Sequence, residues 1–245
     1  MHPFVSLFGL ELSSYGIMCA SGVVCAMALS LYLAYRRGYE LYRVLFLVLI
    51  SVVSGFIGAA LLYIPVTYSP RELIRAIKYG YFSGGFVFYG GFITGILCVW
   101  ILIRKLHFPP ELPGAVLIPS LPLAHALGRV GCFLAGCCYG KASGSFLAVR
   151  FPGMQQTVLP VQLFESGAEL LICAYLVRCS SKNKPYMICR YILLYAPVRF
   201  ALEFLRGDAI RGHALWFSTS QWISLALLVL TAVYLVFAVK KSRKA

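Results

Sequence analysis

The sequence predicts an all-α, polytopic membrane protein with about seven transmembrane helices. Hydrophobic residues make up 60% of the 245 positions, and the mean hydropathy is +0.83. Charged residues account for only 12%, about half the fraction that a soluble domain of this length carries. Apolar runs of roughly 20 residues, long enough to span a bilayer, recur along the whole chain.

The expected spans follow one another without a low-complexity linker or an alternating strand pattern, so residues 1–245 are expected to form a single integral membrane domain. The fourth span contains Pro119 and Pro122 and has Gly128 near its end, so we expect it to bend around a covered or water-filled cavity. The spans are Tyr15–Tyr35, Leu41–Ile64, Phe86–Ile103, Ala115–Phe133, Val161–Val177, Tyr186–Leu205 and Gln221–Val239.

The distribution of basic residues predicts the orientation, because cytoplasmic loops of membrane proteins are enriched in Lys and Arg. The more basic set of connections contains Arg36, Arg37, Arg43, Arg104, Lys105, Arg178, Lys182, Lys184, Arg190, Lys240, Lys241, Arg243 and Lys244. This set is assigned to the cytoplasm, which leaves the N-terminus outside and the C-terminus inside. Residues 65–85, 140–160 and 207–219 then form outward loops. Topology and anionic headgroups account for the net charge of +14, so no nucleic-acid partner is expected.

One segment places a permanent charge at the end of an apolar run. From Gly128 to Gly140 the chain reads GRVGCFLAGCCYG, in which Arg129 is accompanied by four glycines. An arginine at this depth is costly and needs a partner, so it marks a functional site by default. The combination points to an anionic phospholipid.

A second group of ionisable residues lies near the end of the sixth span. Arg199, Glu203 and Arg206 recur at i, i+4 and i+7, which predicts one helical stripe turned into the protein. One interpretation is a structural ion network. The other is that Glu203 orients the two arginines while their free donors bind a phosphate. Two separate arginine-bearing helices that approach the outer face favour the second interpretation.

His125, Arg129 and Cys132 have the same spacing on the fourth span, so we expect the imidazole to lie beside the guanidinium. A lone histidine in an apolar helix is usually a hydrogen-bonded core group, and we prefer that interpretation. The alternative is a catalytic one, since a neutral imidazole beside an arginine can accept a proton.

Two further motifs carry small or acidic residues into the bundle. Glycines surround Tyr89 at the start of the third span, where they permit close helix packing or the approach of backbone amides to a ligand. Pro160 opens the fifth span, and Gln162, Glu165 and Glu169 follow on successive turns.

Taken together and in order, these motifs resemble those of the prolipoprotein diacylglyceryl transferase family. The resemblance covers most of the chain, and its most specific element is the glycine–arginine segment. The matching residues are Tyr15-Gly16, Gly90-Gly91, Gly128-Arg129-Val130-Gly131 through Gly140, Pro160, Gln162, Glu165, Arg199, Glu203, Arg206 and Ser220-Gln221.

The resemblance implies a multi-pass enzyme of the bacterial plasma membrane. It would transfer diacylglycerol from phosphatidylglycerol to the lipobox cysteine of a prolipoprotein, forming a thioether and releasing glycerol phosphate. By the same resemblance Arg129 would bind the phosphate and Arg199 would assist the leaving group. Glu203 and Arg206 would hold the arginine helix in place. The implied substrate-binding residues are Arg129, Tyr15, Gly90, Gly91, Gly128, Gly131, Gly140, Gln162, Glu165, Glu203 and Arg206.

The sequence also departs from the family pattern. The family commonly has a histidine, proposed to help deprotonate the acceptor thiol, where this chain has Tyr89. A tyrosine is a poor base near neutral pH, although it can relay a hydrogen bond. His125 is the nearest substitute, and the field of the arginines is the alternative. A paralogue that acts on a different lipid or acceptor therefore stays open.

The nine cysteines predict neither a metal site nor a cofactor. Cys132, Cys137 and Cys138 cluster, but they form no C-x-x-C motif and have no companion histidine pair. Two other functions remain as alternatives: a membrane thiol-redox protein that uses these thiols, and a non-catalytic phospholipid-binding or transport protein. The redox alternative leaves both arginine groups unexplained. Transport is expected to come with an inverted repeat, and none is apparent in the sequence.

Overall fold

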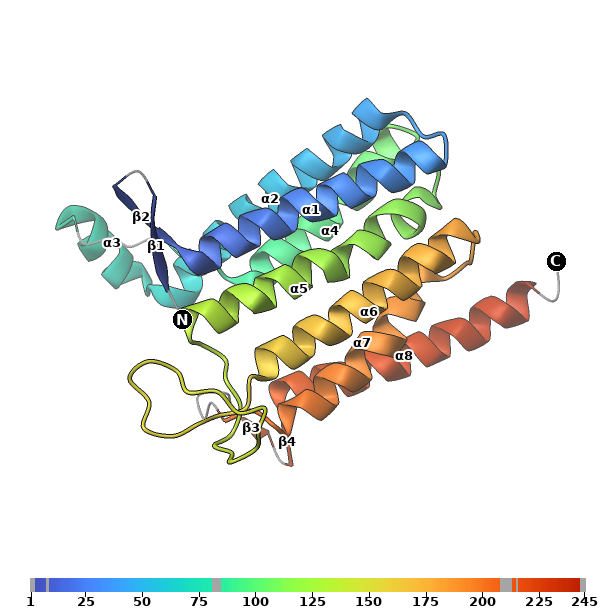
Figure 1. Cartoon of the computed structure of the whole chain (residues 1–245). Helices are drawn as coiled ribbons and strands as arrows, with labels where there is room; N and C mark the ends of the chain where they lie inside the picture. Colours follow the sequence, from blue (N-terminus) through green and yellow to red (C-terminus); the bar gives the residue numbers. More distant parts are fainter. Residues whose placement is uncertain (1–2, 8, 81–84, 208–212, 215, 243–245) are drawn as a thin grey trace. The chain divides into compact units, whose positions relative to one another are not determined.

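The computed structural model describes residues 3–7, 9–80, 85–207, 213–214 and 216–242. The chain divides into two compact units, one made of residues 1–30 and 113–245 and the other of residues 31–112 (Figure 1). Whether they act as one membrane domain stays a prediction.

The described residues are mostly helical, as predicted. Each predicted span overlaps one helix, and the ends differ by only a few residues. The helices are α1 (Ser14–Arg36), α2 (Leu41–Thr67), α3 (Pro70–Lys78), α4 (Phe88–Lys105), α5 (Ile118–Ala135), α6 (Val161–Ser181), α7 (Met187–Glu203) and α8 (Thr219–Ser242).

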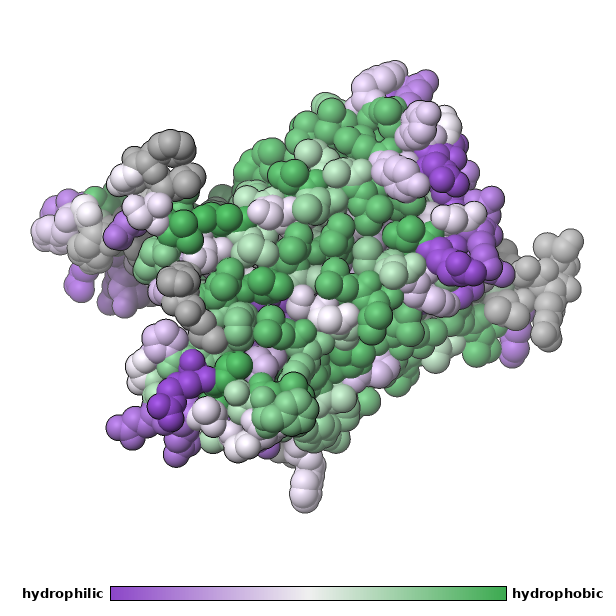
Figure 2. Space-filling model, in the orientation of Figure 1, coloured by the Kyte–Doolittle hydropathy of each residue, from purple (hydrophilic) through white to green (hydrophobic). Residues whose placement is uncertain are grey.

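Within the described residues, 4 helical segments are long and apolar enough to cross a membrane. They are Ser14–Arg36, Leu41–Thr67, Pro113–Ala135 and Thr219–Ala238. Figure 2 shows apolar side chains over much of the surface of the helices, with hydrophilic side chains gathered mainly near the helix ends. A surface of this kind suits a lipid environment better than water.

In the first unit, α5, α6, α7 and α8 pack as successive neighbours (Figure 1). A cluster of buried apolar side chains from α6 and α7, including Leu176 and Met187, packs against Ile118 of α5. The N-terminal half of α1 approaches α5 closely at a glycine. A Cβ at Gly22 would lie 3.0 Å from the carbonyl oxygen of Ala124. This packing places the polar residues of α5, α6 and α7 against one another.

The irregular backbone expected in the fourth span lies before α5 rather than within it. A π-helical turn, η1 (Pro113–Leu117), precedes the helix, and Pro119 occupies its first turn, where a missing N–H costs nothing. Side chains satisfy the carbonyls of the turn: Ser180 Oγ donates to Ala115 O at 2.5 Å and Ser120 Oγ to Val116 O at 3.0 Å. The π-helical backbone therefore lies at the start of the predicted span, while Pro122 is accommodated inside α5.

Several short elements lie where the sequence predicted only loops. Strands β1 (Phe4–Leu7) and β2 (Leu10–Ser13) form an antiparallel hairpin, and β3 (His213–Ala214) pairs with β4 (Phe217–Ser218). The loop expected at residues 65–85 contains α3, which begins with a capping box. Ser69 accepts from the Glu72 backbone N–H, and the Glu72 carboxylate accepts from the Ser69 N–H. This S-x-x-E pattern is the sequence signature of a helix N-terminus.

In the second unit, α2 and α4 pack closely at two glycines in the first turn of α4. A Cβ at Gly90 would lie 2.3 Å from the carbonyl oxygen of Gly58, and one at Gly91 would lie 2.8 Å from that of Gly55. Thr94 Oγ1, at 3.0 Å from Ser54 O, adds a hydrogen bond between the helices. The close-packing interpretation of this glycine cluster thus has a direct geometric basis. The side chain of Tyr89 lies outside the described part of the structure.

We predict that Gly90→Ala destabilises the protein by about 1–3 kcal/mol, the usual cost of overpacking. The added methyl meets the backbone of α2, which cannot rotate away as a side chain can. The Tm of the purified protein in detergent measures the effect. Gly95→Ala is the matched control on α4, because its nearest neighbour, Ser51 O, would be at an ordinary 3.7 Å. Equal Tm values for the two variants would contradict the packing argument.

Candidate active site

The site is built around Arg129 of α5, whose side chain is only 16% exposed. Its partner is supplied by α6: Arg129 NH2 lies 3.0 Å from Oε1 of Glu165, which is fully buried. Tyr195 of α7 donates its hydroxyl to the same oxygen at 3.0 Å. Three helices therefore converge on one buried carboxylate. Removing either member of such a pair leaves an uncompensated charge in a low-dielectric interior.

His125 links this pair to a second buried carboxylate. Its Nδ1 lies 2.5 Å from Oε1 of Glu169, and its Nε2 accepts from Arg129 Nε at 3.3 Å. Tyr191 donates to Glu169 at 3.3 Å. The predicted proximity of His125 and Arg129 is confirmed. Because its Nε2 lone pair faces an arginine N–H, the imidazole orients the guanidinium and is poorly placed to take a proton from elsewhere.

Glu169, Tyr191 and Tyr195 were missed as site residues. Glu169 lies one turn after Glu165, so its position in the bundle was visible from the spacing. The tyrosines precede Arg199 by two turns and one turn on α7, and their rings stack with centroids 5.7 Å apart. The same i, i+4 rule that grouped Arg199 with Glu203 could have included them.

Arg199 forms the second arginine group on α7. Its NH2 lies 2.7 Å from Glu203 Oε2 and donates to Ser220 Oγ at 3.0 Å. Its NH1 atom is buried and has no hydrogen-bond partner among the described residues. A buried charged donor without a partner is costly, so an acceptor is expected at this atom beyond those that the described residues supply.

The predicted stripe of Arg199, Glu203 and Arg206 is only partly correct. Helix α7 ends at Glu203, so Arg206 lies beyond the helix rather than on its face. Its Nε is nevertheless 4.0 Å from Glu203 Oε2, and its backbone forms an antiparallel bridge with Gly140. Arg206 therefore connects the end of α7 to the segment that follows α5.

The glycines of the signature serve different purposes. A Cβ at Gly131 would lie 3.0 Å from Met18 and 3.3 Å from the ring of Tyr15, so Gly131 lets α1 approach α5. At Gly140 an added Cβ would be 2.8 Å from the Leu159 carbonyl oxygen. Gly128 differs, because nothing lies within 4 Å of its Cβ position. No packing contact therefore requires a glycine at Gly128.

Tyr15 and Gln162 also lie in the first unit, near the end of α5. Gln162 is 1% exposed, and its Nε2 donates to the carbonyl oxygen of Cys137 at 2.6 Å. Its Oε1 is buried without a hydrogen-bond partner in the described part of the chain. Tyr15 is 46% exposed. Gln162 therefore anchors the loop after α5, whereas the ring of Tyr15 packs at Gly131.

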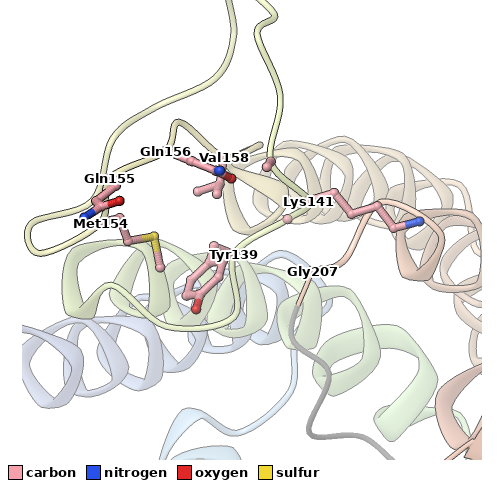
Figure 3. A pocket seen from close by; sticks show the side chains of 9 residues that line it. Tyr139, Lys141, Met154, Gln155, Gln156, Val158 and Gly207 are labelled. Carbon is pink, nitrogen blue, oxygen red and sulfur yellow. The ribbon is translucent and has the colours of Figure 1, made fainter.

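A hollow of about 460 Å³ opens beside this loop. Figure 3 shows that its lining comes from the chain that follows α5, from the loop that leads to α6 and from Gly207 after α7. The lining residues are Tyr139, Gly140, Lys141, Ala142, Met154, Gln155, Gln156, Val158 and Gly207. The lining thus combines amide, backbone and apolar groups with the cationic side chain of Lys141.

The three clustered cysteines converge, although their spacing in the sequence resembled no metal motif. The Sγ atoms of Cys132, Cys137 and Cys138 all lie within 4.8 Å of one another. Gly136 and Cys138 have positive φ angles of 74° and 62°, and they turn the chain back toward α5. Hydrogen bonds from the thiols of Cys132 and Cys137, and then from the Arg206 guanidinium, lower the pKa of the Cys138 thiol.

These features define the class: a helical membrane protein whose interior holds arginine–glutamate pairs beside a cluster of thiols. A family model for prolipoprotein diacylglyceryl transferase matches residues 3–237. The chain belongs to this family of transferases, and the assignment made from its motifs is confirmed.

Curated relatives match over almost their full length. The chain is 33% identical over 230 residues to phosphatidylglycerol–prolipoprotein diacylglyceryl transferase 2 of Clostridium perfringens, covering 91% of this chain and 90% of the relative. It is 32% identical over 249 residues to the Clostridium tetani transferase, with 97% of each covered. A Dehalococcoides mccartyi transferase is 30% identical over 251 residues, covering 98% of this chain and 94% of the relative.

We predict that Glu165→Ala lowers the free energy of unfolding by about 3–5 kcal/mol, because it leaves Arg129 buried without its carboxylate. Chemical denaturation in detergent measures the loss. Glu111→Ala, at an exposed position, is the control and is expected to change stability by less than about 0.5 kcal/mol. The Arg129→Ala/Glu165→Ala double variant should lose less than the sum of the two single losses. If the two single losses add up to the loss of the double variant, the ion pair contributes nothing to the stability.

Proposed function

We propose that this chain transfers diacylglycerol from phosphatidylglycerol to the lipobox cysteine of a prolipoprotein, in the bacterial plasma membrane. The acceptor sulfur attacks the glycerol carbon of the lipid, and a C–S bond replaces the C–O bond. Glycerol phosphate leaves with the electron pair and takes up the thiol proton. The reaction named for the relatives, together with the two buried arginines, supports this proposal.

The observation that carries the proposal is the anchoring of Arg129. Its Nε and NH2 are committed to His125 and Glu165, which fixes the plane of the guanidinium. An arginine has five N–H donors, so others remain for a phosphate oxygen. A guanidinium held in this way needs no reorganisation when it binds an anion.

Arg199 would stabilise the charge that develops on the departing phosphate. Its NH1, which has no hydrogen-bond partner in the described part of the chain, is a buried donor of the kind that electrostatic stabilisation requires. Glu203 and Arg206 would keep that guanidinium in place from the end of α7. Gln162 and Tyr15 would shape the pocket, and the hollow beside Tyr139 is the proposed path of the signal peptide.

We assign His125 a positioning role, because Arg129 and Glu169 occupy both of its ring nitrogens. Tyr89 would relay a hydrogen bond during proton transfer, in the place where the family pattern has a histidine. Gly90 and Gly91 would then serve the site indirectly, by holding α4 against α2.

We further propose seven spans with the N-terminus outside and the C-terminus in the cytoplasm. In addition to the 4 segments that are long and apolar enough to cross a membrane, α4, α6 and α7 would also be spans, with 18, 21 and 17 residues. Helix α6 carries Glu165 and Glu169, whose burial inside the bundle reconciles its lower apolarity with a membrane position. The outward face would then carry the loops at residues 65–85, 140–160 and 207–219.

We predict that Arg129→Ala reduces lipidation by at least about 100-fold, because removing one preorganised donor to a developing negative charge lowers a reaction rate by about that factor. The assay is complementation of cells depleted of their own transferase, with the diacylglyceryl mass shift of a reporter prolipoprotein as the readout. Arg129→Lys should also fail, because one ammonium cannot reach Glu165, His125 and a phosphate together.

Arg178→Ala is the matched control for the arginine variants. Arg178 is exposed in the last turn of α6, at the end of the helix opposite Glu165, so lipidation should be unchanged. Membrane insertion of every variant is checked by immunoblot of the membrane fraction. Normal lipidation by an inserted Arg129→Ala protein would refute the phosphate-binding role.

We predict that reporter proteins fused after residue 242 and within the loop at residues 140–160 will lie on opposite sides of the membrane. A fluorescent protein after residue 242 should be bright and alkaline phosphatase there inactive, because the cytoplasm allows only the first to mature. Fusions within the loop at residues 140–160 should give the reverse. The same pattern at both points would contradict the proposed orientation.

A further inference from the structure

The three thiols at the end of α5 have the geometry of a metal site. Their Sγ atoms lie within 4.8 Å of one another. In a tetrahedral zinc site the Zn–S bonds of about 2.3 Å place the sulfurs about 3.8 Å apart. Small side-chain rotations are therefore enough to bring Cys132, Cys137 and Cys138 to one ion. Sulfur ligands select zinc over magnesium or calcium.

We propose that Cys132, Cys137 and Cys138 bind one Zn²⁺ as three thiolate ligands and leave its fourth position to the thiol of the acceptor cysteine. The inference rests on the proposed function for the identity of that thiol. The trio alone forms the group: no fourth His, Cys, Asp or Glu joins it among the described residues. Structural zinc sites have four protein ligands, whereas catalytic ones have three and an open position.

The surroundings of the trio suit an open site. Cys132 is buried, Cys138 is intermediate and Cys137 is exposed, so the cluster reaches from the interior to the surface. The half-exposed hydroxyl-bearing Tyr15 lies nearby, packed against Gly131. A cysteine held at the surface end of such a cluster leaves a path by which a second protein's thiol can approach.

Charge also favours the site. Three thiolates and Zn²⁺ carry a net charge of about −1, and a fourth thiolate makes it about −2. Arg206 is a hydrogen-bond partner of Cys138, and Arg129 lies one helical turn before Cys132. Two fixed cations therefore adjoin the cluster and offset the added negative charge.

The backbone around the thiols is held in an unusual conformation. Cys138 has a φ of 62°, a left-handed conformation that non-glycine residues adopt rarely. Gln162 holds the preceding residue by donating to the Cys137 carbonyl oxygen at 2.6 Å. The loop is thus fixed from α6, as ligand-bearing loops commonly are by their outer partners.

Such a site would activate the acceptor thiol directly. A thiol that binds zinc gives up its proton, and the bound sulfur keeps a lone pair for attack on the glycerol carbon. The C–S bond forms as the C–O bond breaks, and the proton ends on the released glycerol phosphate. His125 has no free nitrogen for this task, since Glu169 and Arg129 occupy both.

The first test is the metal content of the intact protein, purified in detergent without chelators and measured by mass spectrometry of the elements. We expect roughly one zinc ion per chain. The Cys132→Ser/Cys137→Ser/Cys138→Ser variant should contain none, while the Cys25→Ser control, at an exposed thiol of α1, should match the parent. Cys137→Ala alone, at an exposed position, serves if the triple variant fails to fold. Zinc content independent of these cysteines would overturn the proposal.

The second test replaces zinc with Co²⁺, whose absorption reports thiolate ligands and tetrahedral geometry. A synthetic lipobox peptide should increase the thiolate-to-cobalt absorption, and the same peptide with serine for cysteine should not. No thiolate band with Co²⁺, or a disulfide among the three thiols that excludes the metal, would overturn the site. A band that the cysteine peptide leaves unchanged would overturn the open position.

Transfer activity separates this inference from the proposed function. If both hold, the triple variant loses more than about 100-fold in lipidation, because even outer partners of a metal are worth 10–100-fold. A folded triple variant with full activity keeps the proposed function and overturns the zinc inference. A zinc-bound parent that takes up the peptide thiol but transfers no lipid supports the metal site and refutes the reaction.

Discussion

The charge of Arg129 is the constraint on which the rest of the site depends. A guanidinium on an apolar helix must be neutralised without water, and Glu165 does so from the neighbouring helix. That carboxylate is itself fully buried, so it needs the Tyr195 hydroxyl as well. The alignment of α5, α6 and α7 is thereby fixed by polar contacts that tolerate little displacement, while apolar side chains supply the bulk of the packing.

The sequence predicted the positions of the helices well, because membrane helices are set by runs of apolar residues that need no knowledge of the fold. It also placed His125 beside Arg129, since both lie on one helix at a fixed spacing. Contacts between helices were not predictable in detail. That Glu165 pairs with Arg129 and Glu169 with His125 depends on the rotation of α6 against α5, which no periodicity specifies.

Two other failures have separate physical causes. Arg206 was assigned to the helical stripe because helix ends are set by local backbone geometry, and α7 ends three residues earlier. The cysteines were set aside because known spacings assume ligands on regular turns. Two left-handed residues, Gly136 and Cys138, reverse the chain and join thiols that five and six positions separate. Short polar elements such as α3 were overlooked because hydropathy dominated the prediction, although its capping box was present.

The backbone junction at Gly140 has a mechanical consequence. Gly140 N–H donates to Leu159 O at 2.8 Å, Lys141 N–H donates to Leu205 O at 2.8 Å, and a Cβ at Gly207 would lie 2.5 Å from Gly140 O. Three segments that are distant in the sequence are thus joined by backbone contacts at Gly140, where no side chain can move aside. A displacement of the long loop between α5 and α6 is therefore transmitted to the ends of α5 and α7 together.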